Sequence, residues 1–188
     1  GIEVRLETTV DELIVINRTA KGARLDTGET IHSDIVVSNV DPMHLYKSMV
    51  PQKAQALSAR LKRKHAKLSM GLFVLYFGSR KQYPEVAHHT IWMGKRYRSL
   101  LEDIFKRKML TEDFSLYVHR PTATDPSFAP DGCDTFYALA PVPNLQGDVD
   151  WAVEGPRLRD RIVAALDASM LPGLTEAITS DFFMTPED

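Results

Sequence analysis

The apolar run GLFVLYFG at residues 71–78 constrains the fold of this chain more than any other feature. Alternate residues of a β-strand point to opposite faces, so Phe73, Leu75 and Phe77 share one face and the residues between them share the other. A strand that is apolar on both faces has to be covered on both sides, by helices, another domain or a long apolar ligand. We therefore expect a central strand whose two sets of side chains are both covered, and the sequence pattern leaves open what covers each set.

The residues after Asp41 mix strand and helix patterns. Strands are expected where apolar residues alternate or form short runs, at 68–80, 87–94, 114–126, 134–143 and 179–188. Helices are expected where apolar residues recur at helical spacing, at 41–50, 51–67, 98–110 and 154–178. This mixture predicts an α+β fold, an antiparallel sheet with helices on one face.

The first forty residues have a different, all-β pattern. Strands are expected at 2–10 and 12–17, at 20–28 after a turn at Asn17-Arg18, and at 34–39, the buried strand DIVVSN, after a turn at Thr27-Gly28. Residues 1–40 and 41–188 are therefore expected to belong to two domains, and the chain, which opens within a strand pattern, is expected to be a piece of a longer protein.

Composition excludes several classes of function. The chain has 188 residues and a formal net charge of −2, so its overall charge gives no reason to expect binding to nucleic acid. A single cysteine, Cys133, excludes an intrachain disulfide and suits the cytoplasm. No apolar run has the length of a membrane-spanning helix.

The histidines predict no metal site. His88 and His89 are neighbours at the start of an expected strand, where adjacent side chains point to opposite faces. The other histidines show no ligand spacing.

A basic run, LKRKHAK, ends the expected helix 51–67 and contains Lys62, Arg63, Lys64 and Lys67. Cations are favourable at the C-terminal end of any helix, so the run fits a solvated helix end. It also fits a patch for anionic lipid headgroups. The sequence leaves both interpretations open, and the first is favoured.

Four blocks, SMGLFVLYFG, AHHTIWMGKRYRSLLEDIF, EDFSLYVHRPTATDPSFAPDGCDTFYALAPVPNL and DWAVEGPRLRDRIVAALD, resemble the bacterial and fungal phytoene desaturases. The resemblance extends along essentially the whole chain. It implies a parent enzyme that is an oxidoreductase and a flavoprotein of carotenoid biosynthesis. Such an enzyme uses FAD to dehydrogenate phytoene and other C40 carotenoids, and it associates peripherally with a membrane.

The resemblance also implies candidate site residues. Val10 is placed where a backbone amide and carbonyl meet the adenine of FAD, and Ser38 and Asn39 at the strand end that faces the cofactor. Residues 41–188 match the substrate domain, which does not bind FAD. The candidate substrate-binding residues are apolar or aromatic and belong to its expected strands: Phe73, Leu75, Phe77, Trp92, Tyr137 and Leu139. No catalytic residue is predicted.

The chain departs from the family pattern because it contains no glycine-rich loop to hold the FAD diphosphate on a helix N-terminus. We therefore expect the chain by itself to bind no cofactor, to be inactive and to self-associate through unpaired strand edges. Two alternatives remain, a stand-alone module that binds a hydrophobic ligand or lipid, and a fragment of an enzyme resembling flavin amine oxidases.

Overall fold

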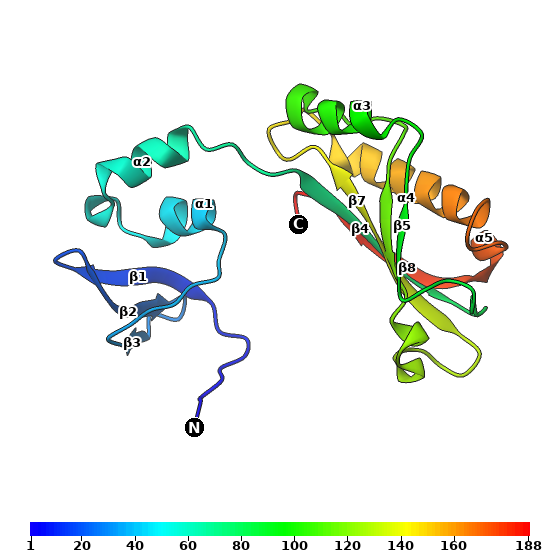
Figure 1. Ribbon diagram of the computed structural model, residues 1–188. Helices are drawn as coiled ribbons and strands as arrows, with labels where there is room; N and C mark the ends of the chain where they lie inside the picture. Colours follow the sequence, from blue (N-terminus) through cyan, green and yellow to red (C-terminus); the bar gives the residue numbers. More distant parts are fainter. The chain divides into compact units, whose positions relative to one another are not determined.

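The structure, a computed structural model, describes residues 1–188 and divides them into two compact units, Gly1–Lys67 and Leu68–Asp188 (Figure 1). The boundary between the units therefore lies after the basic run, whereas the sequence-based boundary lies at residue 41. The assignment of residues 1–40 to a cofactor domain stays a prediction about the parent protein.

The first unit begins with an antiparallel three-stranded meander in the order β1-β2-β3. Its strands are β1 (Val10–Ile16), β2 (Thr19–Leu25) and β3 (Thr30–His32). Asn17 and Arg18 join β1 to β2 with φ angles of 50° and 62°, as a two-residue hairpin turn requires. Gly28, with φ of 88°, lies in the turn before β3. Both predicted turns are confirmed.

Two predicted strands of the first unit are wrong. Residues 2–9 and 34–39 form no strand, and the side chains of Ile35 and Val37 are 79% and 90% exposed. Their apolar patterns suit strands, but a strand needs a hydrogen-bonded neighbour, and the sheet of this unit pairs only β1, β2 and β3.

The helices of the first unit are short. Helix α1 (Pro42–His44) is capped by Asp41, whose carboxylate accepts hydrogen bonds from the amides of Met43 at 2.8 Å and His44 at 3.1 Å. A π-helical turn at Leu45–Met49 and a 3₁₀ turn at Gln52–Ala54 lead to α2 (Leu57–Lys64). The helix predicted at 51–67 is therefore shorter than expected, because Pro51 opens the separate 3₁₀ turn.

The second unit is built on an antiparallel five-stranded sheet in the order β5-β6-β7-β4-β8. Its strands, in chain order, are β4 (Gly71–Ser79), β5 (His89–Trp92), β6 (Leu116–His119), β7 (Asp134–Val142) and β8 (Ile178–Met184). β4 pairs with β7 on one side and β8 on the other. The prediction that GLFVLYFG is a central strand is confirmed.

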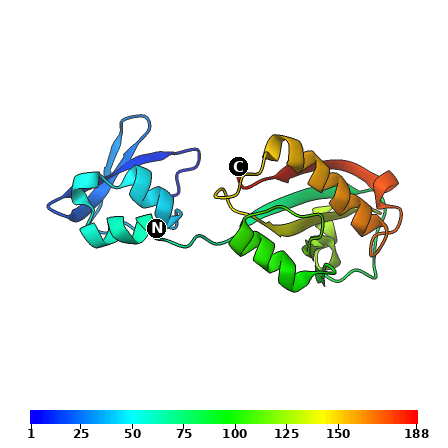
Figure 2. The ribbon, with the colours of Figure 1, turned by 90° about the horizontal axis from the view of Figure 1, so that it is seen from above.

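The helices of the second unit include α3 (Tyr97–Glu102), which continues as a π-helical turn at Asp103–Arg107, α4 (Trp151–Asp167) and α5 (Leu174–Ala177). Short 3₁₀ turns lie at Pro121–Ala123 and Pro126–Phe128. Helix α4 runs along the sheet (Figure 2). The α+β class is confirmed. None of the helices combines the length and the apolar character needed to cross a bilayer.

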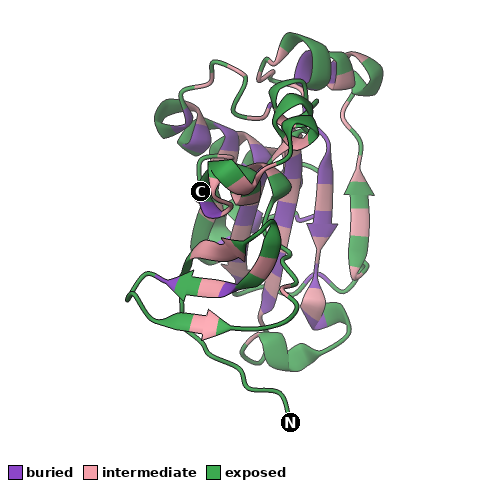
Figure 3. Ribbon diagram, turned by 90° about the vertical axis from the view of Figure 1, so that its left-hand side faces the viewer, coloured by how far each residue is buried: buried purple, intermediate pink, exposed green.

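One face of the sheet forms the core with α4. Phe73 and Leu75 of β4 are fully buried in one cluster with Leu158, Ile162 and Leu166 of α4. Buried and half-buried residues alternate along β4 and β7, which gives the banding of the central strands in Figure 3. Each fully buried leucine or phenylalanine contributes about 1.5–3 kcal/mol of transfer free energy. This face therefore supplies most of the stability of the unit.

A buried ion pair lies at the start of β7. Arg120 donates to both carboxylate oxygens of Asp134, at 2.9 and 3.2 Å. Asp134 also accepts from the Thr122 hydroxyl at 2.7 Å and the Tyr83 amide at 2.7 Å, while Arg120 donates to the Val86 carbonyl at 3.0 Å. These partners satisfy the hydrogen bonding of the two buried charged groups. The same contacts hold the loop with Tyr83 and Val86 and the loop with Thr122 against the sheet.

Candidate functional site

The face of the sheet opposite the core presents a row of rings that crosses all five strands. We call it the aromatic row: Phe182, Tyr76, Tyr137, His119 and His89, from β8 to β5. Neighbouring ring centroids are 4.7, 5.6, 4.7 and 5.2 Å apart in that order. Cross-strand pairs of this kind each contribute roughly 0.2–1 kcal/mol to the stability of a sheet.

A second row runs beside the first and is mainly aliphatic. We call it the apolar row: Met184, Val74, Leu139, Tyr117 and Ile91, again from β8 to β5. Its two ends are the most open, with Ile91 62% and Met184 42% exposed. Phe182, in the aromatic row, is 60% exposed. Exposed apolar side chains at both edges of a half-buried apolar face make this face a candidate binding surface.

The surroundings of two ionisable side chains on the open face, Tyr137 and His119, shift their pKa values toward the neutral forms. Burial, reinforced by a hydrogen bond with Tyr117, raises the pKa of Tyr137 above the ordinary tyrosine value. Burial, together with the neighbouring His88 and His89, lowers the pKa of His119. Since neither row contains an acidic or a strongly basic side chain, the face suits a neutral, apolar ligand.

The structure divides the predicted substrate-binding residues between the two faces. Phe73, Leu75 and Phe77 are 0%, 0% and 3% exposed and pack in the core under α4. This position gives them a structural role, and substrate contact by these three stays an untested prediction. The open face carries instead the alternating set to which Tyr76 belongs.

The other three predicted substrate-binding residues lie on both sides of the sheet. Trp92 is half-buried and packs on the core side, with its ring centroid 5.6 Å from that of Phe114. Tyr137 belongs to the aromatic row and Leu139 to the apolar row. These two are therefore brought together with residues that the sequence did not single out, above all Phe182, His89 and His119.

The predicted cofactor-binding residues all lie in the first unit. Val10 opens β1 opposite Leu25 and is 36% exposed. Ser38 accepts a hydrogen bond from the amide of Val40 at 3.3 Å, and Asn39 next to it is exposed. Their contact with FAD stays a prediction.

The second unit also has a hollow between residues 107–112 and the N-terminal half of α4, with a volume of about 1110 Å³. Charged residues of both signs dominate its lining: Arg107, Lys108, Glu112, Asp148, Asp150, Glu154, Arg157, Asp160 and Arg161. Such a lining is unsuitable for a hydrocarbon, because an apolar ligand would displace water from charges without replacing its hydrogen bonds.

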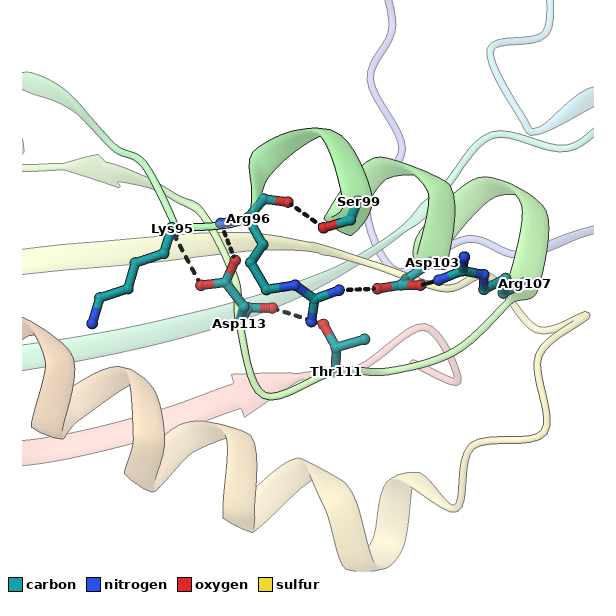
Figure 4. Close-up of polar contacts among 7 residues, drawn as sticks. All are labelled: Lys95, Arg96, Ser99, Asp103, Arg107, Thr111 and Asp113. Atoms are coloured by element: carbon teal, nitrogen blue, oxygen red, sulfur yellow. Dashed lines mark hydrogen bonds and ion pairs between the residues drawn. The ribbon is translucent and has the colours of Figure 1, made fainter.

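Beside this hollow, carboxylates hold α3 in place (Figure 4). Asp103, which is buried, accepts from Arg96 at 3.2 Å and from Arg107 at 2.5 Å. Asp113 accepts from the amides of Lys95 at 3.1 Å and Arg96 at 2.7 Å, before the first turn of the helix. These acidic groups therefore have structural partners, which leaves the open face of the sheet as the candidate functional site.

Parts of several larger solved structures share this fold. The structure resembles an oxidoreductase from Methanosarcina mazei, with a TM-score of 0.61 and 14% identity over 95% of this chain and 37% of that one. It also resembles a putrescine oxidase, with a TM-score of 0.57 and 12% identity over 94% of this chain and 33% of that one. At these identities the likeness shows the fold alone, an α+β fold that occurs as part of both of these larger proteins. No family model matches the chain.

The curated relatives are much more similar in sequence than the solved structures are. The chain is 44% identical over its whole length to a lycopene-forming phytoene desaturase of Pseudescherichia vulneris and to a neurosporene-forming one of Rhodobacter capsulatus. It is 34% identical to a zeta-carotene-forming phytoene desaturase of Myxococcus xanthus. The chain is thus a homologue of the phytoene desaturases, as the sequence blocks predicted, and it spans 36–38% of the length of these three relatives.

Proposed function

We propose that this chain is the substrate-binding part of an FAD-dependent carotenoid desaturase and that the open face of its sheet forms one wall of the site for a C40 polyene such as phytoene. The observation that carries the proposal is the pair of rows, aromatic and apolar, that cross all five strands and contain no Asp, Glu, Lys or Arg. Homology to phytoene desaturases supports the substrate class.

The dimensions of the face suit a long, flat ligand. Five strands at a spacing of about 4.8 Å make each row roughly 19 Å long. A polyene that lies along these rows contacts rings on one side and aliphatic groups on the other, so that dispersion and apolar burial hold it without a directional hydrogen bond. This arrangement favours a neutral hydrocarbon over an amine, which would require a charged partner.

FAD, when bound to the parent enzyme, would accept the hydride, since no side chain of this chain can do so. Within this chain Val10, Ser38 and Asn39 are the residues proposed to contact it. The exposed, neutral polar side chains of Ser38 and Asn39 fit hydrogen bonding to a dinucleotide. The role of the open face is then to hold the polyene and exclude water.

We further propose that the parent enzyme works at the cytoplasmic surface of a membrane, from which it collects its hydrocarbon substrate. Helix α2 supports this proposal, because Leu57 and Leu61 are 75% and 59% exposed and Lys62, Arg63 and Lys64 follow in its last turn. Apolar side chains beside cations are the pattern of helices that lie at an anionic membrane surface.

The substrate proposal is tested in the full-length desaturase with the double substitution Tyr76→Ala and Tyr137→Ala. We expect phytoene conversion to fall roughly tenfold or more, as two aromatic contacts are lost, while FAD content stays the same. Val153→Ala, at a 44% exposed position of α4, is the control and should be neutral. Unchanged phytoene conversion in the double variant would show that the open face is not part of the substrate site.

The membrane proposal is tested by cosedimentation with anionic liposomes after Lys62, Arg63, Lys64 and Lys67 are all changed to Glu. Each cation near anionic headgroups contributes about 1 kcal/mol, so binding should be almost abolished. The matched control makes the same charge change on other exposed lysines: Lys21, Lys53, Lys95 and Lys106. Equal binding by the two variants would contradict the membrane proposal and support the interpretation of the basic run as a solvated helix end.

A further inference from the structure

Three histidines converge at the β5 end of the aromatic row. His88, His89 and His119 each place a ring nitrogen so that the three atoms lie within 4.8 Å of one another. The sequence argument against a shared ion assumed that His88 and His89 both lie within a strand, on opposite faces. In the structure β5 begins at His89, so His88 is free of this alternation, and the two ring centroids are 4.3 Å apart.

Two of the histidines have hydroxyl partners on their Nδ1 atoms. His89 Nδ1 is 2.7 Å from the hydroxyl of Tyr117, and His88 Nδ1 contacts the hydroxyl of Thr124. In protein metal sites the nitrogen that does not bind the ion is usually held by such an outer partner, which fixes the ring and its tautomer. Where these hydroxyls accept, the two Nε2 atoms present lone pairs.

The third histidine faces the first directly. His119 Nε2 lies 2.7 Å from His88 Nε2, while His119 Nδ1 is buried and has no hydrogen-bond partner. Two neutral imidazoles can share one proton across such a contact, but the pair can equally direct both lone pairs at one cation. A cation held between them would use the nitrogens that already converge.

We propose that His88, His89 and His119 bind a transition-metal dication, with Zn²⁺ as the ion they suit best. Imidazole nitrogens are typical ligands of Zn²⁺ and its neighbours in the first transition row, whereas Ca²⁺ and Mg²⁺ take oxygen ligands. Three protein ligands leave a fourth position for water. The proposal does not depend on the desaturase proposal.

The geometry needs only small ring movements. At a Zn–N distance of about 2.05 Å, two nitrogens of a tetrahedral site are about 3.3 Å apart. The Nε2 atoms of His88 and His119 are 2.7 Å apart, and one ring nitrogen from each of the three histidines lies within 4.8 Å of the other two. His89 is exposed and His88 half-buried, so rotation of their rings can reach the tetrahedral spacing.

The first experiment titrates the 188-residue chain with Zn²⁺ in a calorimeter. We expect one ion per chain with a Kd of about 1 μM or tighter. Replacement by Co²⁺ should give the intense visible absorption of four-coordinate nitrogen ligation. Binding weaker than roughly 100 μM, or a Co²⁺ spectrum of the octahedral aqueous ion, would refute the site.

Substitutions then locate the ion. His119→Ala and His89→Ala should each weaken Zn²⁺ binding by at least roughly 100-fold, and Thr124→Val, which removes an outer partner, by roughly tenfold. His32→Ala and His44→Ala remove histidines outside the cluster and should have no effect. Far-UV circular dichroism checks folding. His89 is exposed on an edge strand, so His89→Ala stays interpretable even where His119→Ala destabilises the fold. Binding that survives His89→Ala, or that His32→Ala or His44→Ala abolishes, would contradict the proposal.

Discussion

The two units of the chain differ sharply in how far their apolar side chains are buried. The second unit buries many of its large apolar side chains in one cluster between the sheet and α4, although its open face leaves Ile91, Phe182 and Met184 exposed. Among the large apolar residues of the first unit only Leu25 and Met49 are buried, whereas Ile2, Val4 and Leu6 are 93%, 73% and 82% exposed. Similar apolar patterns therefore lead to different outcomes, and the difference is whether a packed partner is present.

This contrast predicts that stability resides in the second unit. Burial of apolar area supplies the dominant favourable free energy of folding, and a unit that buries little of it gains little from cooperative packing. Substitutions in the two units should therefore have unequal effects, and matched pairs of substitutions measure the inequality.

The largest effect is expected from Asp134→Ala, which leaves Arg120 buried and without its carboxylate. Breaking a buried pair by removing one partner typically costs about 3–5 kcal/mol of stability. Urea unfolding followed by circular dichroism measures the loss. Asp131→Ala, at an exposed position of the preceding loop, is the control and should change little. A loss below about 1 kcal/mol would show that water replaces the carboxylate.

A nearly equal effect is expected from Leu158→Ala, because this α4 side chain is fully buried against the sheet. The cavity left behind should reduce the unfolding free energy by about 2–5 kcal/mol. Leu61→Ala on α2, where the leucine is 59% exposed, should stay within about 0.5 kcal/mol. Similar losses from the two leucine variants would break the contrast between the units.

Helix caps give a smaller, matched comparison. Asp150 accepts a hydrogen bond from the amide of Val153 at 3.3 Å at the start of α4, and Asp41 plays the same role at the start of α1. Asp150→Ala should lower the unfolding free energy by about 1 kcal/mol. Asp41→Ala should leave the main unfolding transition unchanged, because α1 buries no residue in a core. A shift of the main transition by Asp41→Ala would show that both units unfold together.

The smallest expected effect is on how the stability of the chain falls at low pH. Hydrogen bonds from the side chain and amide of Thr175, and then from the amide of Gly173, lower the pKa of Asp167 below the usual aspartate value. A carboxyl with a lowered folded-state pKa adds stability above its ordinary pKa, and this contribution is lost as pH falls through the folded-state value. The Tm of Asp167→Asn should therefore fall less steeply in acid than that of the original chain. Parallel profiles would mean that Asp167 plays no part in acid unfolding.

Much of the second unit could be predicted from the sequence, because its patterns match its environment. The alternation along 71–79 gave a central strand with two faces, and the burial of Phe73 and Leu75 confirms that one face packs under a helix. The strands predicted at 2–10 and 34–39 failed because an apolar pattern shows suitability for a sheet and not the presence of a neighbouring strand.

The candidate site could be predicted only in part. Tyr137 and Leu139 were found because they lie in an apolar strand, but the aromatic row depends on the register of five strands. The register of the strands decides which residues are neighbours across the sheet. The alternation of apolar residues along one strand does not determine that register. The contact between His88 and His119 was missed for the same reason, since the two residues are 31 positions apart.

The strict alternation along β4 and β7 also limits how the length of this protein can vary. One residue added early in either strand would turn every later side chain to the other face, so that the tyrosine of that strand entered the core and its buried phenylalanines left it. Insertions and deletions are therefore expected in the connections, such as residues 120–133 and 143–150, where a changed length leaves the pairing of the strands intact.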